Sequence, residues 1–379
     1  MDFSLSKQEQ LFLQMIREFA EKEVKPLAAE VDESERFPME TVQKMAKLGI
    51  MGIPFPVEFG GAGGSNILYT MAVEELSRVC ATTGVIVSAH TSLCCAPIME
   101  HGTPEQKAKY LPKLTSGEWI GAFGLTEPNA GTDASAQQTF AVKEGDHYVL
   151  NGSKIFITNA GYAYVYIIMA MTDKSKGTKG ISAFIVEKDF PGFSIGKKEK
   201  KMGIRGSATC ELIMENCIVP AENLLGQEGK GFGIAMKTLD GGRIGIASQA
   251  LGIAQGAMDE TVKYVKERKQ FGKAIGQFQN TQFQLADLQT KIEAARLLVR
   301  QAAYKKDLKV PYSADAAMAK LFAAETAMEV TTKAVQFHGG YGYTREYPVE
   351  RMMRDAKITE IYEGTSEVQR MVIAANLLK

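Results

Sequence analysis

The sequence contains few cysteines and histidines, and their spacing is not that of a metal site. The five cysteines are odd in number, and the four histidines (His90, His101, His147 and His338) are scattered along the chain. Structural zinc and a disulfide framework both need regularly spaced ligands, so the pattern favours reduced thiols in a cytoplasmic protein. We therefore expect a cytoplasmic location and no metal.

An excess of one charge and a long apolar run are also missing. The chain has 44 Lys and Arg against 44 Asp and Glu, which gives no support to nucleic acid or an anionic membrane as the main partner. Apolar runs such as Tyr164–Met171 are far shorter than the ~20 residues of a membrane helix. Residues 1–3 lead directly into an amphipathic helix, without the basic region, apolar core or cleavage site of a signal peptide. We expect no membrane insertion.

Two glycine signatures of phosphate binding are absent as well. No GxGxxG turn occurs, which argues against a nicotinamide-binding doubly wound fold. The loop Phe59–Ser65 is rich in glycine but lacks the GxxxxGK[ST] pattern, so a flexible or tight connection is favoured over a phosphate cradle.

The hydrophobic period changes twice along the chain, which is long enough for two or three domains. The first third is helical, with a capping box at Ser6–Glu9 and a second helix opened by Pro38. After Gly121, short β-branched or aromatic runs predict a small antiparallel β domain; they lie at 140–143, 147–150, 165–171, 181–187 and 210–219. Long helical segments at about 232–269, 280–306 and 313–338 then predict a helical bundle.

The most informative carboxylate is Glu363, within the stretch Ile358–Arg370. It lies between a tyrosine and a glycine, and Ser366 can N-cap a last helix with Glu367 in its first turn. A carboxylate in a tight loop beside apolar neighbours has a raised pKa, which is useful in a general base. From the pattern alone, a turn with a solvated glutamate is the favoured interpretation, because most glutamates are solvated.

Five motifs within this layout resemble the acyl-CoA dehydrogenase flavoprotein family, over essentially the whole chain. In this order and at these separations they are highly specific, and they are most similar to the short-chain, butyryl-CoA type. The motifs are FGLTEPNAGTD at 123–133, NGSKIFITN at 151–159, ERKQFG at 267–272, QFHGG at 336–340 and IYEGT at 361–365.

The resemblance implies a mostly α, α+β fold with an N-terminal helical domain (1–120), a middle antiparallel β domain (121–228) and a C-terminal four-helix bundle (229–379). It implies FAD-dependent conversion of butyryl-CoA to crotonyl-CoA, in which Glu363 takes the α-proton and FAD the β-hydride. Electrons would pass to an electron-transferring flavoprotein. Alternatives are a branched short-chain or glutaryl substrate, oxygen as the oxidant, and a non-catalytic flavin-binding subunit that relays electrons.

The resemblance also implies two groups of FAD contacts, from two subunits. The subunit that carries the base would contact FAD with Phe123, Leu125, Thr126, Thr132, Phe156, Ile157, Thr158, Thr365 and Glu367. A neighbouring subunit would bind the ADP half with Arg268, Phe271, Gln279, Gln336, Phe337, His338, Gly339 and Gly340. A homodimer is then the minimal competent unit, and a homotetramer made of two dimers is expected.

Read without the resemblance, these residues have simpler explanations. Thr126 and Asp133 would stabilise a β-turn, Arg268 would be a surface charge, and Gly339 and Gly340 a helix C-cap. His338 is expected to be structural on either reading. Many family members carry tryptophan where this chain has Phe156.

Substrate contacts are implied at Thr132, Asp240, Gly241, Gly242, Arg243, Tyr362 and Gly364, with Arg243 as the anchor. Members that act on long or branched chains place their catalytic glutamate near position 242. This chain has glycine there, so Glu363 has no rival. Without the resemblance, Asp240–Arg243 would be a glycine break in a helix with a surface ion pair.

Overall fold

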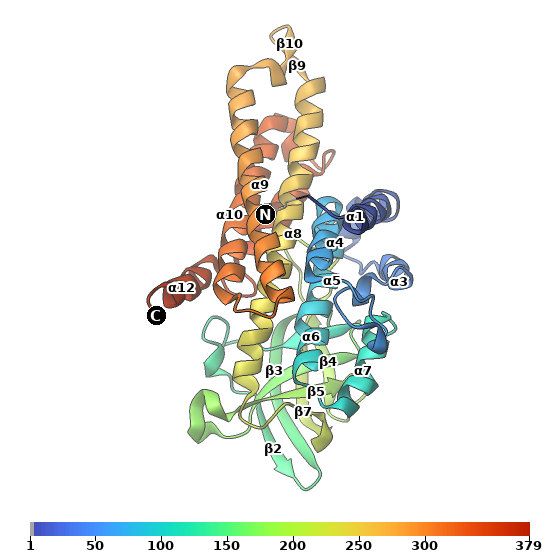
Figure 1. Cartoon of the computed structure of the whole chain (residues 1–379), viewed down its shortest axis with the longest axis vertical. Coiled ribbons are helices and arrows are strands. Elements are labelled where there is room, and N and C mark those ends of the chain that lie inside the picture. Colours follow the sequence, from blue (N-terminus) through green and yellow to red (C-terminus); the bar gives the residue numbers. More distant parts are fainter. Residues whose placement is uncertain (1–3) are drawn as a thin grey trace.

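The N-terminal third of the chain forms a layer of helices (Figure 1). In the computed structural model, which describes residues 4–379, Ser6 caps the first helix through the predicted capping box. The expectation about a signal peptide rests on residues 1–3, which lie outside the described part. The α-helices of this layer are α1 (Lys7–Phe19), α2 (Ala28–Ser34), α3 (Met39–Lys47), α4 (Asn66–Val79), α5 (Ala81–Ala89), α6 (Ala96–His101) and α7 (Pro104–Thr115).

Helices α5 and α6 belong to one helical stretch, Ala81–His101, joined by a π-helical turn at His90–Cys95. Within this stretch the sequence predicts a helix only at residues 92–100. By length and composition the stretch could cross a membrane, but 94% of its most apolar window is buried inside the protein. It is therefore packed as a core helix.

The ring of His90 joins this core helix to the β domain. Its Nδ1 accepts a hydrogen bond from the Gly121 N–H at 2.9 Å, so Nε2 carries the proton and donates to the Leu114 carbonyl at 3.1 Å. Burial lowers the pKa of His90 to about 4, so the ring stays neutral and serves as a structural bridge.

The middle of the chain forms one eight-stranded sheet in the order β6-β7-β3-β2-β4-β5-β8, with β1 beside β4. Most pairings are antiparallel, and the predicted hairpin at 140–150 is confirmed. However, β1 and β2 each run parallel to β4, so the sheet is mixed rather than purely antiparallel. The strands are β1 (Gly121–Gly124), β2 (Phe140–Glu144), β3 (His147–Thr158), β4 (Val165–Met171), β5 (Ile181–Glu187), β6 (Phe193–Lys198), β7 (Thr209–Pro220) and β8 (Leu224–Leu225).

The C-terminal third returns to helices, as predicted. Alanines at helical spacing on α10 (Ala316, Ala319, Ala323 and Ala327) are completely buried, which lets neighbouring helices approach closely. The small hairpin of β9 and β10 lies at the far tip of the bundle, and α12 projects from its side (Figure 1). The elements are α8 (Gly231–Glu267), β9 (Lys269–Gln270), β10 (Lys273–Ala274), α9 (Gln279–Asp307), α10 (Ser313–His338), α11 (Val349–Lys357) and α12 (Ser366–Leu377).

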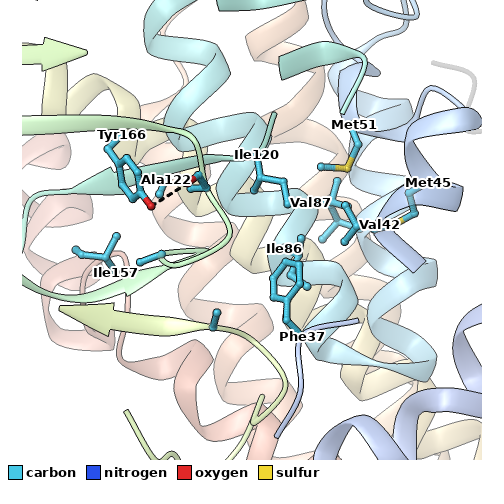
Figure 2. Packing of buried hydrophobic residues seen from close by; sticks show 14 of the residues in the cluster. Phe37, Val42, Met45, Met51, Ile86, Val87, Ile120, Ala122, Ile157 and Tyr166 are labelled. Carbon is cyan, nitrogen blue, oxygen red and sulfur yellow. Dashed lines mark hydrogen bonds between the residues drawn. The ribbon is translucent and has the colours of Figure 1, made fainter. Parts of the chain in front are cut away.

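A continuous apolar core joins the N-terminal helices to the sheet. Figure 2 shows Met45 and Met51 from the helical layer, and Ile157 and Tyr166 from the sheet, in the same buried cluster. A second cluster lies between α8, α9 and α10. Because the first cluster contains residues of both, the N-terminal helices and the sheet are packed directly against each other.

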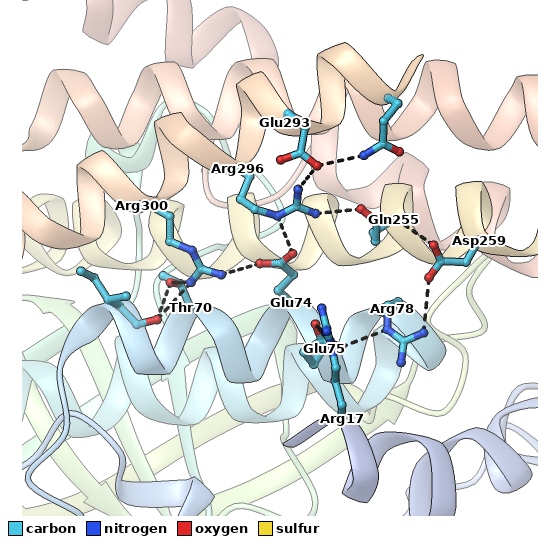
Figure 3. A network of polar contacts seen from close by, with 12 residues as sticks. Arg17, Thr70, Glu74, Glu75, Arg78, Gln255, Asp259, Glu293, Arg296 and Arg300 are labelled. Carbon is cyan, nitrogen blue, oxygen red and sulfur yellow. Dashed lines mark hydrogen bonds and ion pairs between the residues drawn. The ribbon is translucent and has the colours of Figure 1, made fainter. Parts of the chain in front are cut away.

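Buried ion pairs fix α4 against its neighbours (Figure 3). Glu74 accepts hydrogen bonds from Arg296 at 3.0 Å and from Arg300 at 2.8 Å, both on α9. Glu75 pairs in the same way with Arg17 of α1 and Arg78. Both carboxylates are almost fully buried, so removing both arginine partners of either one would leave an uncompensated charge. These pairs hold the helical layer and the bundle in one rigid arrangement.

Candidate active site

Glu363 lies in a tight turn between α11 and α12. Its φ is +53°, and that of Gly364 is +93°, so both residues adopt the left-handed region that disfavours a glutamate. Thr365, rather than the predicted Ser366, is the N-cap of α12; its hydroxyl accepts from the Val368 N–H at 3.4 Å. The helix starts one residue earlier than the sequence suggested, because the preceding turn ends at Gly364.

The carboxylate of Glu363 faces away from bulk water. The residue as a whole is partly exposed, but its Oε2 is buried and has no hydrogen-bond partner within residues 4–379. Burial raises the pKa of Glu363 to about 8, and the positive charges of Lys320 and Arg243 oppose that rise. The sequence suggested surroundings that raise the pKa of this carboxyl, and the structure places it in such surroundings.

The carboxylate opens onto a cavity of about 290 Å³ between the β domain and α8. Arg243, Tyr362 and Gly364 line it on the side of the base. Seven residues predicted to contact the flavin line its other walls: Phe123, Leu125, Thr126, Thr132, Phe156, Ile157 and Thr158. Residues distant in sequence are thus brought together as predicted.

Neighbouring residues of the 240–243 segment of α8 point to different sides of the helix. Gly242 faces the Glu363 carboxylate, whereas a side chain at Gly241 would point at the Lys306 ammonium instead. Asp240 accepts from Arg243 Nη1 at 2.5 Å and from the Ser313 hydroxyl at 2.8 Å, and burial raises the pKa of its carboxyl. Asp240 therefore orients Arg243 but does not itself line the cavity.

A second group of predicted residues forms a separate surface pocket of about 480 Å³. It contains Arg268, Phe337, His338, Gly339 and Gly340. The remaining predicted residues, Phe271, Gln279 and Gln336, do not line this pocket, and the Phe271 side chain is 93% exposed at the bundle tip.

The ring of His338 within this pocket is held by its own helix. Its Nδ1 lies 2.8 Å from the Ala334 carbonyl, and the ring stacks on Tyr264 at 4.2 Å. Burial lowers the pKa of His338, which agrees with a neutral, structural ring.

The two groups lie far apart on one chain. Arg268 is the C-cap of α8 and follows Gly242 by 26 residues, which at ~1.5 Å per residue is about 39 Å along the helix axis. Thr365 and Glu367 lie with the first group, at the start of α12. A single chain therefore presents two half-sites that face different regions of the surface.

Some residues of the site carried no signal in the sequence. The apolar side of the cavity comes from Val85, Ala89, Leu93, Phe232, Met236 and Leu239, and such residues on a helix are normally read as core. Lys320 and Gln369, whose side chains donate hydrogen bonds to carbonyls of the Glu363 turn, were also not predicted. A lysine among buried alanines on α10 is the one signal that could have drawn attention to Lys320.

The site holds a carboxylate of raised pKa that has no partner at its Oε2 within residues 4–379 and faces a cavity with apolar side chains on one side. Such an arrangement suits an enzyme that takes a proton from carbon. Comparison with known proteins then gives the family. Models of the N-terminal, middle and C-terminal domains of acyl-CoA dehydrogenases match residues 6–118, 122–217 and 229–378. The chain belongs to the acyl-CoA dehydrogenase family.

Individual relatives are similar over their whole length. The short-chain-specific acyl-CoA dehydrogenase of Clostridium acetobutylicum is 67% identical over 379 residues, covering 100% of both chains. The structure of butyryl-CoA dehydrogenase from Megasphaera elsdenii has a TM-score of 0.98 at 55% identity, again with 100% coverage of both chains. A structure described under the electron-transferring flavoprotein of Acidaminococcus fermentans and flavin-based electron bifurcation has a TM-score of 0.99 at 58% identity, with the same coverage.

Members of this family bind FAD, and the residues present fit that cofactor. Five of the eleven buried polar side-chain atoms without a partner within residues 4–379 lie at the two half-sites: Glu363 Oε2, Ser366 Oγ, Gln369 Oε1 and Arg243 Nε at the first, and His338 Nε2 at the second. Unsatisfied buried groups are rare in folded proteins, and a bound ligand would give these five atoms partners. The cavity walls add three threonine hydroxyls and aromatic surface suited to a flavin ring.

Proposed function

We propose that this protein dehydrogenates short straight-chain acyl-CoA thioesters, converting butyryl-CoA to crotonyl-CoA. The observation that carries the proposal is the Glu363 carboxylate, which is unpaired, buried and adjacent to an apolar cavity. The α-proton of a thioester is only weakly acidic, so a carboxylate whose pKa lies near 8 is a far better base for it than an ordinary one. The names of the full-length relatives support the same substrate class.

In this proposal the chain performs three tasks. Glu363 takes the α-proton at a carboxylate oxygen, in a cavity from which the substrate has displaced water. The Glu363 backbone N–H donates no hydrogen bond within residues 4–379, which leaves it free to donate to the thioester carbonyl as negative charge develops there. Arg243, held by Asp240, anchors the thioester side of the substrate. When bound, FAD supplies the acceptor for the β-hydride.

We propose that the first half-site contacts the flavin ring and that the second, from a neighbouring copy, binds the ADP half. The ~39 Å between them along α8 supports two chains per site. The guanidinium of Arg268 suits a pyrophosphate, and Gly339 and Gly340 permit close backbone approach; a side chain at either glycine would meet nothing within 4 Å. A homodimer is then the minimal unit, and two dimers form the tetramer.

The remaining assignments are also proposals. We propose three units at 1–120, 121–228 and 229–379, a cytoplasmic location, and an electron-transferring flavoprotein as the electron acceptor. The matched domain models lie inside those three ranges. The structure described for Acidaminococcus fermentans supports the partner.

A visible absorption titration with butyryl-CoA tests the proposal. The purified, yellow protein should lose its flavin absorbance near one equivalent of substrate, and E363Q should not. Bleaching by a branched or glutaryl thioester instead would keep the base and replace the substrate. An E363Q variant as active as the parent would favour a non-catalytic flavin subunit, and a protein that cannot be reconstituted with FAD would refute the proposal.

A further inference from the structure

A lysine lies buried beneath the turn that carries Glu363. Lys320 of α10 has no exposed surface, and its Nζ donates to the carbonyl oxygen of Gly364 at 2.7 Å. The adjacent positions of the same helix face, including Ala316 and Ala323, are alanines. Burial disfavours an ammonium and lowers the pKa of Lys320 to about 8, so packing alone does not account for a lysine at this position.

A second buried donor converges on the same turn. The side-chain amide of Gln369 donates to the carbonyls of Glu363 at 3.2 Å and Gly364 at 2.8 Å. The backbone of Glu363 adopts the left-handed region, a conformation that is unfavourable for any residue except glycine. The hydrogen bonds from Lys320 and Gln369 therefore stabilise a turn that the local sequence does not favour.

The charge of Lys320 is also close enough to act on the carboxylate. Two cations face Glu363, Lys320 from α10 and Arg243 from α8, and each lowers the pKa of its carboxyl against the larger effect of burial. Arg243 is already paired with Asp240, whereas Lys320 makes no direct ion pair within residues 4–379. The other titratable groups around this pair are Tyr69 of α4, Tyr362, Glu360 and Glu367.

We propose that Lys320 is a positioning residue for the base: its ammonium holds the Gly364 carbonyl, which fixes the turn, and provides the unpaired positive charge that Glu363 faces when it ionises. The inference rests on the proposed function of Glu363. Lys320 contacts the backbone of the turn and does not line the cavity, so it acts through Glu363 and not on the substrate.

Three variants of the FAD-loaded enzyme separate these contributions. K320M keeps the length of the side chain but removes both donor and charge, and K320Q keeps a donor without the charge. K333M is the matched control, because Lys333 is an exposed lysine on the same helix. The readouts are kcat and KM for butyryl-CoA, the pH profile of kcat/KM, and hydrogen exchange of the 361–369 peptide without substrate.

We expect K320M to lose kcat about 10–100-fold with little change in KM, since it misplaces a base within hydrogen-bonding reach. The acid limb of its kcat/KM profile should move up by about one pH unit, the usual effect of losing an opposite charge. K320Q should show the same movement with a smaller loss of kcat. The 361–369 peptide should exchange faster in K320M and not in K333M.

An acid limb that stays in place in both folded Lys320 variants overturns the inference, as does unchanged exchange of the turn. If K320M fails to fold, K320Q provides the same pH test. If butyryl-CoA does not reduce the flavin of the parent enzyme, the proposed function is refuted instead. The hydrogen-exchange comparison would still report whether Lys320 holds the turn.

Discussion

Gly242 of α8 and the carboxylate of Glu363 occupy the same small space. A Cβ atom built on Gly242 would lie 1.9 Å from Glu363 Oε2 and 2.8 Å from Leu93 Cδ2. Real side chains essentially never approach so closely, so a side chain at position 242 would displace the Glu363 carboxylate and the end of Leu93 from the positions that they hold. Gly242 is therefore more than the absence of a rival glutamate. It leaves free the space that the Glu363 carboxylate occupies.

G242A should accordingly inactivate the enzyme without unfolding it. Alanine in mid-helix is favoured over glycine by about 1 kcal/mol, which offsets part of the collision, while the displaced carboxylate should cost about 100-fold in kcat. The measurement is the rate of flavin bleaching by butyryl-CoA in a stopped-flow instrument.

The control for this variant is G233A, on the same helix, where an added Cβ meets nothing within 4 Å. G233A should be slightly more stable and fully active. If G242A is as active as G233A, the carboxylate can move aside at no cost and the steric requirement does not hold.

The pH dependence of stability should also reveal the buried carboxylate. The pKa of Glu363 is raised from 4.5 to about 8 on folding, so between these values the folded state binds more protons than the unfolded state. Stability then falls as pH rises through this window. At 1.36 kcal/mol per pKa unit, the loss between pH 5 and pH 8 is up to about 4 kcal/mol.

E363Q removes this titration, so urea unfolding of parent and variant at the two pH values tests the sign. The variant should gain stability relative to the parent as pH rises. A constant difference between them from pH 5 to pH 8 would mean that the carboxyl titrates normally in the folded protein.

Within the β domain, Lys154 should prove essential for stability. It is fully buried, and its Nζ donates to Glu127 at 2.6 Å, to the Leu125 carbonyl at 3.2 Å and to Gln137 at 3.2 Å. K154M would leave the Glu127 carboxylate buried without a cation, which typically costs about 3–5 kcal/mol. Equilibrium unfolding in urea measures the loss.

Two further variants make this result specific. Neutralising both partners in K154M/E127Q should recover part of the stability. K143M, at an exposed position on β2, should lie within about 0.5 kcal/mol of the parent. A K154M protein as stable as K143M would show that Glu127 is compensated by other groups.

The sequence predicted the long elements because they leave local signals, whereas the local pattern at Glu363 favoured a solvated glutamate and only the family motifs indicated a base there. The helical period gave α8, α9 and α10 within a few residues, and the turn residues around Glu363 marked a tight, apolar loop. The family motifs then indicated which distant segments meet. Cavity residues such as Thr126 and Phe156 were found in this way, since nothing in their local pattern distinguishes a ligand contact from a β-turn.

What the sequence did not predict depends on tertiary contacts. Lys320 reads as an exposed helix residue until α10 is packed against the turn, and Leu93 reads as ordinary core. The parallel pairing of β1 with β4 depends on where the helices before β1 place the start of that strand. The residue pattern of a strand does not contain this information. The N-cap of α12 is Thr365 and not the predicted Ser366. Both residue types are good caps, so only the geometry of the preceding turn determines which of them caps the helix.

The separation of the two half-sites leads to a complementation test. E363Q lacks the base but keeps Arg268, whereas R268E keeps the base but places a negative charge where the cofactor pyrophosphate would bind. E363Q should be inactive as a homodimer because it has no base. R268E should be inactive because it retains FAD at least 10-fold more weakly, through the loss of charge-assisted hydrogen bonds. In a mixed dimer, however, the Glu363 of one chain meets the intact Arg268 of the other.

Random pairing of the two chains in equal amounts makes half of the dimers mixed, and each mixed dimer contains one intact site of two, so about a quarter of the parent activity should return. The measurement is butyryl-CoA turnover by co-expressed, differently tagged chains purified through both tags in sequence, which removes tetramers built from one variant alone and so raises the expected value only slightly above a quarter. If a single chain supplied both halves of the cofactor site, the E363Q chain would hold the flavin without a base and the R268E chain a base without flavin. Co-expression would then restore nothing, and the shared site between two copies would have to be abandoned.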